Sequence, residues 1–202
     1  MKARTILRTT ASALALVLAA TVLCGVAYPA AVTGVAQALF PWQANGSIIE
    51  VDGVAYGSDL VGQPFQDERH LWGRLTDASA SLISGEDGQP ALWYQSAALS
   101  PASDEFAVRT AERVAEVRAA HPDQGDRPVP SDLVTASGSG FDPHISPAAA
   151  EYQVGRIAAA TGYSVDDVRA VIDACTEQPL LGVLGEPRVN VLRVNLMLDG
   201  LL

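Results

Sequence analysis

Lysine is almost absent from this chain: Lys2 is the only lysine among the 13 basic residues of a 202-residue sequence. A Walker A loop needs a lysine to reach the β- and γ-phosphates of a nucleotide. Schiff-base catalysis and the phosphate-binding lysine of a kinase need one as well. The sequence therefore excludes an autonomous nucleotide hydrolase or kinase of these types.

Cysteine is nearly as scarce, with Cys24 in a long apolar stretch and Cys175 far beyond it. This separation makes an internal disulfide implausible, because a disulfide needs closely placed Cα atoms. Two cysteines are also too few for a zinc site with four thiolates. Cys175 falls on an apolar helical stripe, so we expect it to be a small core residue.

Charged side chains are missing altogether from residues 9–49. A helix of about 20 apolar residues crosses a bilayer, and we expect such a helix over residues 11–33. The basic residues Lys2, Arg4 and Arg8 precede it, and basic flanks stay on the cytoplasmic side. The interpretation is a single-pass protein of the cell membrane.

The membrane helix divides the rest of the chain. Residues 1–10 are then a cytoplasmic N-terminus, residues 34–47 a linker, and residues 48–202 one extracytoplasmic domain. A cleaved secretory signal is the alternative, although the apolar run exceeds the usual 7–15 residues of a signal core. Both interpretations export the same domain and differ in whether it stays tethered.

The exported part is strongly acidic. All 23 acidic residues lie at or after Glu50, and they face 10 arginines once the three N-terminal basic residues are set aside. Binding of phosphate-rich partners depends on clustered positive charge. The balance of charge therefore argues against nucleic acid and anionic lipid as partners.

We expect an α+β fold with one N-terminal transmembrane helix and a single extracytoplasmic mixed α/β domain. A hairpin is predicted where Asp52-Gly53 separates two short apolar runs, and residues 76–103 read as an irregular excursion. Helices are predicted at 101–120, with Ala107, Ala111, Val114 and Val117 inward, at 147–161, from 164 onward, and at the C-terminus behind Asn190.

A loop rich in small residues holds the first candidate site: Ser137, Ser139, Asp142 and His144 precede the helix that begins after Ser146. Hydroxyls and free amides beside a helix start could bind an anion, whereas a packed loop capped by Ser146 is the plainer interpretation. A serine hydrolase is formally possible, but the Gly-x-Ser-x-Gly elbow is absent. Metal binding by Asp142, His144 and Glu151 lacks the helical ligand spacing.

A second candidate lies near the C-terminus, where Glu186 and Arg188 flank a proline and Asn190 interrupts an apolar run. Side chains of these types hold turns and cap helices, yet they could equally line a buried interface with a partner subunit. The residues leave both interpretations open. His70 and His121 stand alone in the sequence, and we expect them at the surface.

Three segments make the sequence resemble a known family. They are residues 57–65, which contain Gly62 and Gln63, residues 129–158, and residues 184–199. Their amino-acid sequences and their order along the chain resemble those of the C chain of the bacterial potassium-transporting Kdp ATPase (the KdpC family). A single N-terminal membrane helix ahead of them matches this family as well. Residues 70–101 depart from the family's usual pattern.

The resemblance implies a non-catalytic accessory subunit of a P-type pump. Its partners would be a catalytic chain that hydrolyses ATP, a channel-like chain that conducts potassium, and a small membrane peptide subunit. The family's C chain is thought to stabilise the complex and has been described as raising the ATP affinity of the catalytic chain. ATP is thus implied through that partner, and a domain on the outer face conflicts with direct nucleotide contact. A membrane-tethered hydrolase and an exported binding module are the alternatives.

Overall fold

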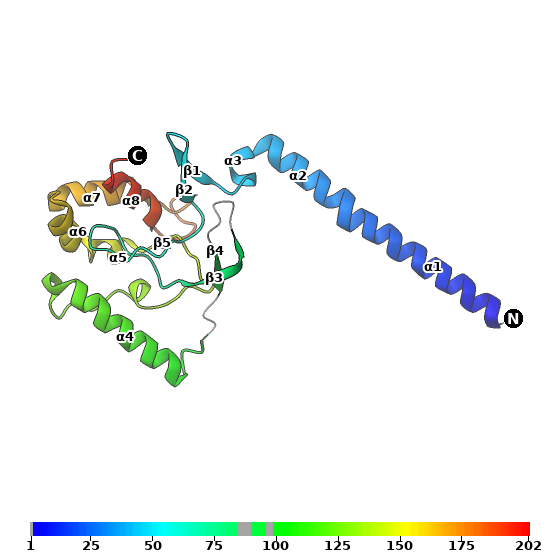
Figure 1. The fold of residues 1–202 in the computed structure, drawn as a ribbon, viewed down its shortest axis with the longest axis horizontal. Helices are drawn as coiled ribbons and strands as arrows, with labels where there is room; N and C mark the ends of the chain where they lie inside the picture. The colour runs from blue at the N-terminus through cyan, green and yellow to red at the C-terminus, as the bar shows by residue number, and fades with distance from the viewer. Residues whose placement is uncertain (1, 85–89, 96–98) are drawn as a thin grey trace. The chain divides into compact units, whose positions relative to one another are not determined.

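A computed structural model describes residues 2–84, 90–95 and 99–202 of the chain. The chain divides into two compact units, Met1–Ile48 and Ile49–Leu202. Figure 1 shows a long helix in the first unit and a mixture of helices and short strands in the second. The expected α+β class, with one apolar N-terminal helix ahead of a mixed domain, is confirmed.

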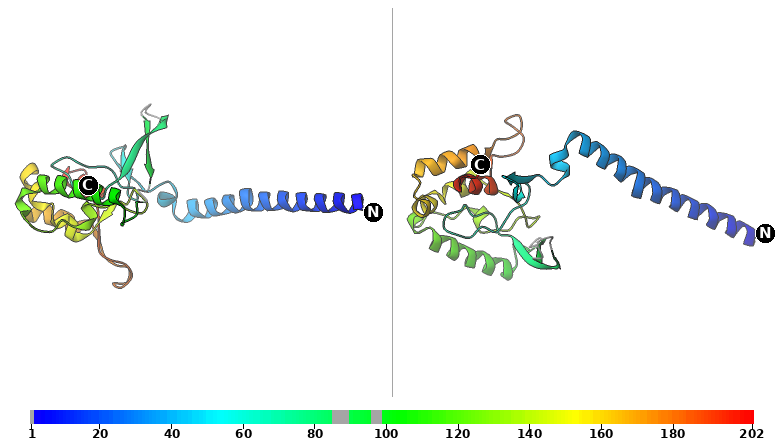
Figure 2. Two further views of the ribbon diagram at one scale, coloured as in Figure 1. Left: turned by 90° about the horizontal axis from the view of Figure 1, so that it is seen from below. Right: turned by 45° about the horizontal axis from the view of Figure 1, so that its top comes forward.

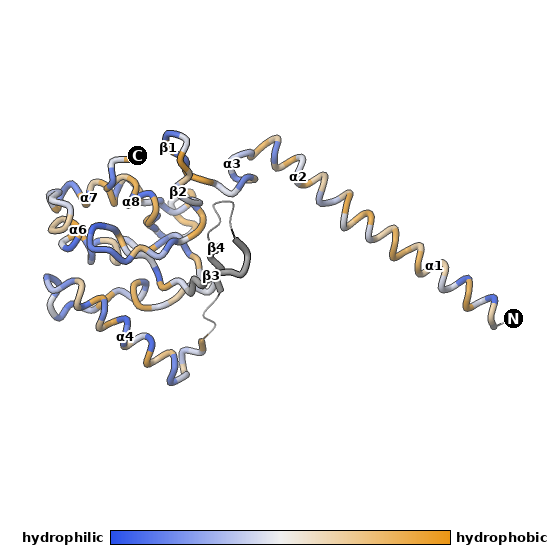
Figure 3. Tube along the Cα trace, viewed as in Figure 1, coloured by the Kyte–Doolittle hydropathy of each residue, from blue (hydrophilic) through white to orange (hydrophobic). Residues whose placement is uncertain are grey.

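The first unit is helical nearly throughout: α1 (Lys2–Val22), a π-helical turn η1 (Leu23–Ala27), α2 (Tyr28–Leu39) and α3 (Pro41–Ala44). The π turn lies directly ahead of Pro29, which cannot donate the backbone bond of a regular helix. Among the described residues, one helix, Ala3–Leu39, is long and apolar enough to cross a membrane, and Figure 3 shows its apolar character. The helix therefore runs past residue 33, so residues 34–39 of the expected linker are helical.

The predicted hairpin is confirmed as β1 (Ile48–Val51) and β2 (Val54–Ser58). Asp52 and Gly53 have φ values of 52° and 80°, as a turn with two left-handed residues requires. The prediction of an irregular segment over residues 76–103 is wrong, because β3 (Asp77–Ser84) and β4 (Pro90–Gln95) pair antiparallel. The run Leu92-Trp93-Tyr94 has high β propensity, which the small residues around it concealed. Residues 85–89 and 96–98 of this segment lie outside the described part.

Three of the helices begin where the sequence predicts. The side chains of Ser146, Ser164 and Asn190 accept backbone N–H bonds at the starts of α5 (Pro147–Glu151), α7 (Val165–Ala174) and α8 (Val191–Leu198). The helix expected over 147–161 is interrupted at Tyr152-Gln153, and α6 (Val154–Thr161) follows. Gly162, with φ of 80°, ends α6 as predicted. Short 3-10 turns, η2 (Pro122–Gln124) and η3 (Ser131–Leu133), lie in the connections.

The inward face of α4 (Asp104–Ala120) differs from the expectation. Val117 is buried and Val114 partly so, but Ala107 and Ala111 are exposed. Arg113 lies inward instead, where its Nε donates to Leu133 O over 3.0 Å and its guanidinium stacks 5.2 Å from the Trp72 ring centre. Apolar periodicity misses this face because a charged residue supplies part of it.

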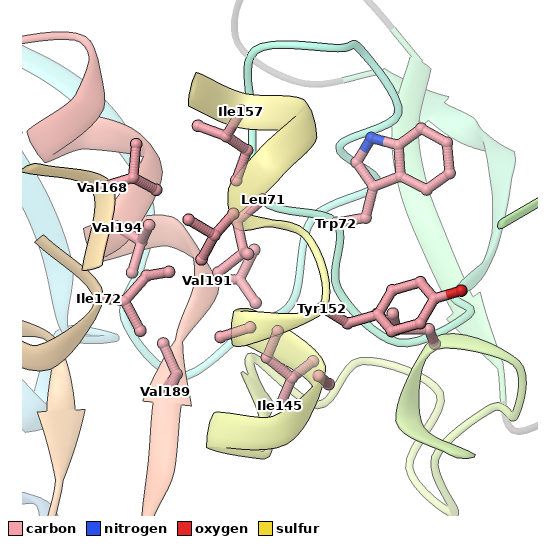
Figure 4. Packing of buried hydrophobic residues seen from close by; sticks show 14 of the residues in the cluster. Leu71, Trp72, Ile145, Tyr152, Ile157, Val168, Ile172, Val189, Val191 and Val194 are labelled. Atoms are coloured by element: carbon pink, nitrogen blue, oxygen red, sulfur yellow. The ribbon is translucent and has the colours of Figure 1, made fainter. Parts of the chain in front are cut away.

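The core of the second unit lies around the sheet of β5 (His144–Ile145), β7 (Arg188–Asn190) and β6 (Thr176–Glu177), in that order and antiparallel. Figure 4 shows Leu71 among the side chains of Ile157, Val191 and Val194. Cys175 is buried, as predicted. The loop that carries Leu71 and Trp72 thus contributes to the core beside the helices.

Two amide side chains hold this loop. Asn195 bonds both the N–H (2.7 Å) and the C=O (3.1 Å) of Leu71. Gln153 does the same for Trp72, at 2.8 Å and 3.0 Å. Each amide satisfies a backbone donor and a backbone acceptor, as a neighbouring strand would. The loop therefore enters the core without a strand partner.

His121 is buried, so the expectation of a surface position is wrong. Its Nδ1 lies 2.6 Å from Val117 O, and its Nε2 accepts a bond of 2.9 Å from Arg156 Nε. These contacts require a neutral ring with the proton on Nδ1. Burial, followed by the charges of Arg156 and Arg113, lowers the pKa of His121 against the opposing effects of the bond to Val117 O and the charge of Asp123. His70 is also partly buried, between the carboxylates of Asp67 and Asp199.

Candidate functional site

The loop before α5 and the start of β7 meet at an open cavity of about 360 Å³, here called the charged cavity. Four predicted site residues line it: Asp142, His144, Glu186 and Arg188. The fold brings them together because β5 pairs with β7, which places His144 opposite Asn190. Its other lining residues are Arg74, Asp132, Ile145, Ser146 and Pro187.

Asp142 is the most connected carboxylate of the charged cavity. Its Oδ1 accepts the backbone N–H of His144 over 3.0 Å and lies 3.6 Å from His144 Nδ1. Its Oδ2 lies 3.4 Å from Nη1 of Arg74. The His144 side chain, its backbone N–H and the Arg74 guanidinium hold the pKa of Asp142 below its usual range, although burial opposes them. Asp142 is therefore ionised at neutral pH.

Arg188, which lines the cavity, is held from the neighbouring strand of the sheet. Glu177 on β6 faces Arg188 on β7, and its Oε2 accepts bonds of 2.9 Å and 2.7 Å from the Nε and Nη2 of Arg188. Its Oε1 also lies 3.9 Å from Nε2 of His144. The imidazole of His144 consequently lies between the carboxylates of Asp142 and Glu177.

Ser137 and Ser139 do not reach this cavity. Their hydroxyls lie 3.1 Å apart, and they accept backbone N–H bonds from Gly140 and Phe141 respectively. Ser137 instead lines a separate cavity of about 160 Å³ with residues of α4. The two hydroxyls shape their own turn, and the ring of His144 contacts carboxylates instead. This arrangement does not resemble a nucleophile beside its general base.

Gly62 and Gln63 contact or adjoin the loop of residues 134–143 between η3 and β5, here called the site loop. The Gly62 N–H donates to Phe141 O over 2.7 Å, and a Cβ at this position would lie 2.5 Å from the carbonyl oxygen of Asp142. Gln63 Nε2 donates to Tyr56 O over 3.1 Å on β2. The glycine permits a close backbone approach that fixes the site loop, and Gln63 ties the same segment to the first hairpin.

The Asn190 side chain contacts an ion pair of which Asp59 is buried and Arg193 is partly exposed. Its Nδ2 donates to the backbone oxygen and the Oδ1 of Asp59, at 2.9 Å and 3.1 Å. Arg193 donates to both carboxylate oxygens of Asp59 at 2.6 Å and 2.7 Å. Its bond to Asp59 raises the pKa of Arg193. Asn190 therefore has two structural roles, as helix cap and as anchor of the loop around Asp59.

Sequence reasoning missed Arg74, Glu177 and the pair of Asp59 with Arg193. Arg74 donates to Ala136 O over 3.0 Å, which links the loop after Trp72 to the site loop. No local motif marks any of these residues, because each partner lies far away in the chain. Glu151, weighed as a metal ligand, instead pairs with Arg169 over 2.6 Å.

The side chains that line the charged cavity carry charges of both signs. Two arginines and three carboxylates line it, together with His144. The hydroxyl of its one serine, Ser146, accepts the N–H of Ala149 as a helix cap. A mixed set of fixed charges in an open recess suits recognition of a polar group or of another protein's surface.

Comparison with known proteins supports the resemblance described from the sequence. Residues 10–200 match the family model described as "K+-transporting ATPase, c chain". The chain is similar to the "Potassium-transporting ATPase KdpC subunit" of Clostridium perfringens, with 50% identity over 92% of this chain and 94% of the relative. It is also similar to proteins of the same name from Sorangium cellulosum, with 50% identity over 93% and 95%, and Herpetosiphon aurantiacus, with 48% over 93% and 93%. The chain belongs to the KdpC family, the C chains of potassium-transporting ATPases.

Proposed function

We propose that this chain is a non-catalytic accessory subunit that stabilises an assembled potassium-transporting ATPase in the cell membrane. The family match carries the proposal, because it runs from residue 10 to residue 200 and so includes both the apolar helix and the domain. A chain related over both parts supports one function for anchor and domain together. The anchor holds the chain in the bilayer and the domain contacts partner chains.

The charge distribution supports one orientation. Arg4 and Arg8 lie at the N-terminal end of the apolar helix, and the residues that follow, 9–49, carry no charge. Basic flanks remain cytoplasmic, which places the acidic domain outside the cytoplasm. Protease added to intact spheroplasts should remove the C-terminal domain, and protection until lysis would contradict this orientation.

Catalysis belongs to other chains in this proposal. With Lys2 as its only lysine, the chain cannot contain the Asp-Lys-Thr phosphorylation motif implied for the catalytic partner. ATP binding and hydrolysis are accordingly assigned to that catalytic chain, and potassium conduction to the channel-like chain. A small membrane peptide subunit completes the proposed assembly.

The charged cavity is the proposed docking recess for a partner chain. Ion pairs within the domain hold its charged side chains in place. Arg74 pairs with Asp142, and Arg188 pairs with Glu177. Side chains fixed before binding lose little entropy on association. Fixed charges of both signs favour a partner with a matching pattern over other surfaces.

The test removes the anchor but keeps the export of the domain. Residues 1–31 are replaced by a cleavable secretory signal, and the variant is co-expressed with the catalytic and channel-like chains. We expect loss of co-purification with the pump, while the exported domain shows the thermal midpoint it has in the full chain. Normal recovery of the complete complex with the truncated chain would refute the proposal.

A further inference from the structure

The connection between β6 and β7 carries an exposed apolar loop, residues 180–184. Its four large side chains are almost fully in water: Leu180 is 68% exposed, Leu181 84%, Val183 79% and Leu184 59%. Both views of Figure 2 show the connection that follows α7 and precedes α8 projecting from the domain. Four adjacent aliphatic side chains in water are unfavourable unless another surface covers them.

The backbone of the apolar loop is well defined. Leu180 and Leu184 exchange two hydrogen bonds of 3.0 Å, and Gly182 N donates to Pro179 O over 2.9 Å. These bonds close a tight turn at the end of the β6–β7 ladder. The apolar side chains are therefore presented on an ordered turn, which lowers the entropy cost of binding a partner.

Leu181 has a backbone conformation that disfavours leucine. Its φ is +55°, in the left-handed region where glycine and asparagine are favoured and bulky side chains are strained. The same side chain is the most exposed large apolar group of the loop. Neither the turn nor the core of this domain accounts for leucine here, and a binding role would.

The apolar loop is continuous with the charged cavity. Glu186, Pro187 and Arg188 follow it directly and line that cavity. Arg188 is held by Glu177 at 2.7 Å, so the base of the loop is fixed to the sheet. The apolar loop and the charged cavity consequently form one surface with an apolar projection beside a polar recess.

The charge of the domain decides between a lipid and a protein as occupant. From Glu50 onward the chain has 23 acidic residues and 10 arginines, and residues 178–185 carry no charge. Loops that bind anionic membranes combine apolar residues with basic ones, and here the surrounding field would repel such a surface. A protein recess is the occupant that fits.

We propose that the apolar loop inserts into an apolar recess of a partner chain of the potassium pump, with a neutral or basic rim facing the charged cavity. The inference rests on the proposed function and names the segment that carries it. Burial of these exposed aliphatic side chains in a partner's recess would stabilise the complex in proportion to the apolar area removed from water. The loop, not the acidic surface, then holds the domain on the complex.

The test uses the full-length chain, co-expressed with the catalytic and channel-like chains. The double variant Leu181→Asn with Val183→Ser removes the two most exposed side chains, and asparagine suits the left-handed backbone at 181. The matched control is Val108→Gln on α4, which removes an aliphatic side chain that is 58% exposed. The measurement is the rate at which the tagged chain dissociates from the purified complex on dilution.

We expect the double variant to dissociate about tenfold faster or more, with an unchanged or higher thermal midpoint, and the control to match the parent chain. If the parent and the double variant dissociate equally, the loop proposal is wrong while the proposed function stands. If the parent chain itself does not co-purify with the pump, both the loop proposal and the proposed function are wrong. Loss of self-association by the isolated full-length double variant, with normal assembly, would assign the loop to a second copy and overturn the proposal.

Discussion

The sharpest prediction concerns Arg156, a guanidinium that is only 7% exposed. All five of its N–H donors have acceptors, and every acceptor is neutral: His121 Nε2 at 2.9 Å, Gln153 Oε1 at 2.8 Å, and the backbone oxygens of Asp67, Glu68 and His70 at 3.0, 2.6 and 2.9 Å. The guanidinium also stacks 4.7 Å from the Trp72 ring centre. One side chain thus holds the loop of residues 67–72 on α6.

The substitution Arg156→Met keeps the apolar stem and removes the donors. Each buried acceptor left without a partner costs about 1–3 kcal/mol. Some of the five acceptors would regain water, because a groove of about 580 Å³ opens beside Trp72 and Arg156. Two or three stranded acceptors at this cost give a loss of about 2–9 kcal/mol, against a typical total stability of about 5–15 kcal/mol.

The opposing effect is the cost of burying a charge. Burial lowers the pKa of Arg156 to about 10, so the side chain stays charged at neutral pH and methionine would relieve this cost. Replacing both members of a buried polar pair can be neutral. Here the acceptors include backbone carbonyls that a substitution cannot remove, so the loss prevails.

The assay is urea unfolding of the full-length chain in detergent, followed by tryptophan fluorescence, to which the buried Trp72 contributes together with Trp42 and Trp93. The control is Arg169→Ala, which breaks the exposed pair with Glu151 and should change the free energy of unfolding little, because solvent screens an exposed ion pair. A loss below about 1 kcal/mol for Arg156→Met would refute the argument that this guanidinium holds the loop.

Three further predictions concern a buried titration, a close contact and a helix cap. The pKa of His121 is lowered by burial, so its contribution to stability is complete above about pH 6.5 and is lost as the pH falls below that value. Unfolding from pH 7.5 down to pH 5 should show this loss, and His121→Gln should reduce it; an equal fall in the variant would contradict the assignment. Gly62→Ala should lower the free energy of unfolding by about 1–3 kcal/mol, because the new Cβ would lie 2.5 Å from Asp142 O. A thermal midpoint equal to the parent's would contradict this prediction and show that the loop moves to make room for the methyl group. Ser164→Ala should cost about 1 kcal/mol in urea unfolding, since its Oγ accepts the Asp167 N–H; Ser164→Thr, which keeps a hydroxyl that can accept this bond and donate to the Asp167 carboxylate, should recover most of it.

Features set by neighbouring residues were predictable from the sequence. The turn of Asp52-Gly53, the caps Ser146 and Asn190, and the stop at Gly162 each depend on a few adjacent residues. The C-terminal run fits a strand or a helix by its apolar pattern, and the cap at Asn190 decides for the helix. Local chemistry therefore located most helix starts.

Features that depend on distant partners were not predictable. Asp59 and Arg193 lie 134 residues apart, and the sequence around either one gives no sign of the other. His121 resembles a surface residue until Arg156 supplies its donor. Four members of the charged cavity were named from the sequence, but Arg74 was missed, because its position depends on how the loop after Trp72 crosses the site loop.

The polar side chains in the core explain how this domain keeps a long irregular loop in one conformation. The loop of residues 59–74 has little regular structure, yet Asn190, Asn195, Gln153 and Arg156 bond its backbone at several points from β7, α6 and α8. A loop held in this way is ordered before any partner arrives, so association does not carry the cost of ordering it. Replacing these amides with apolar residues could preserve the packed volume, but it would release the loop. The polar side chains of the core thus determine the conformation of this loop, whereas the apolar side chains around them supply the buried apolar area.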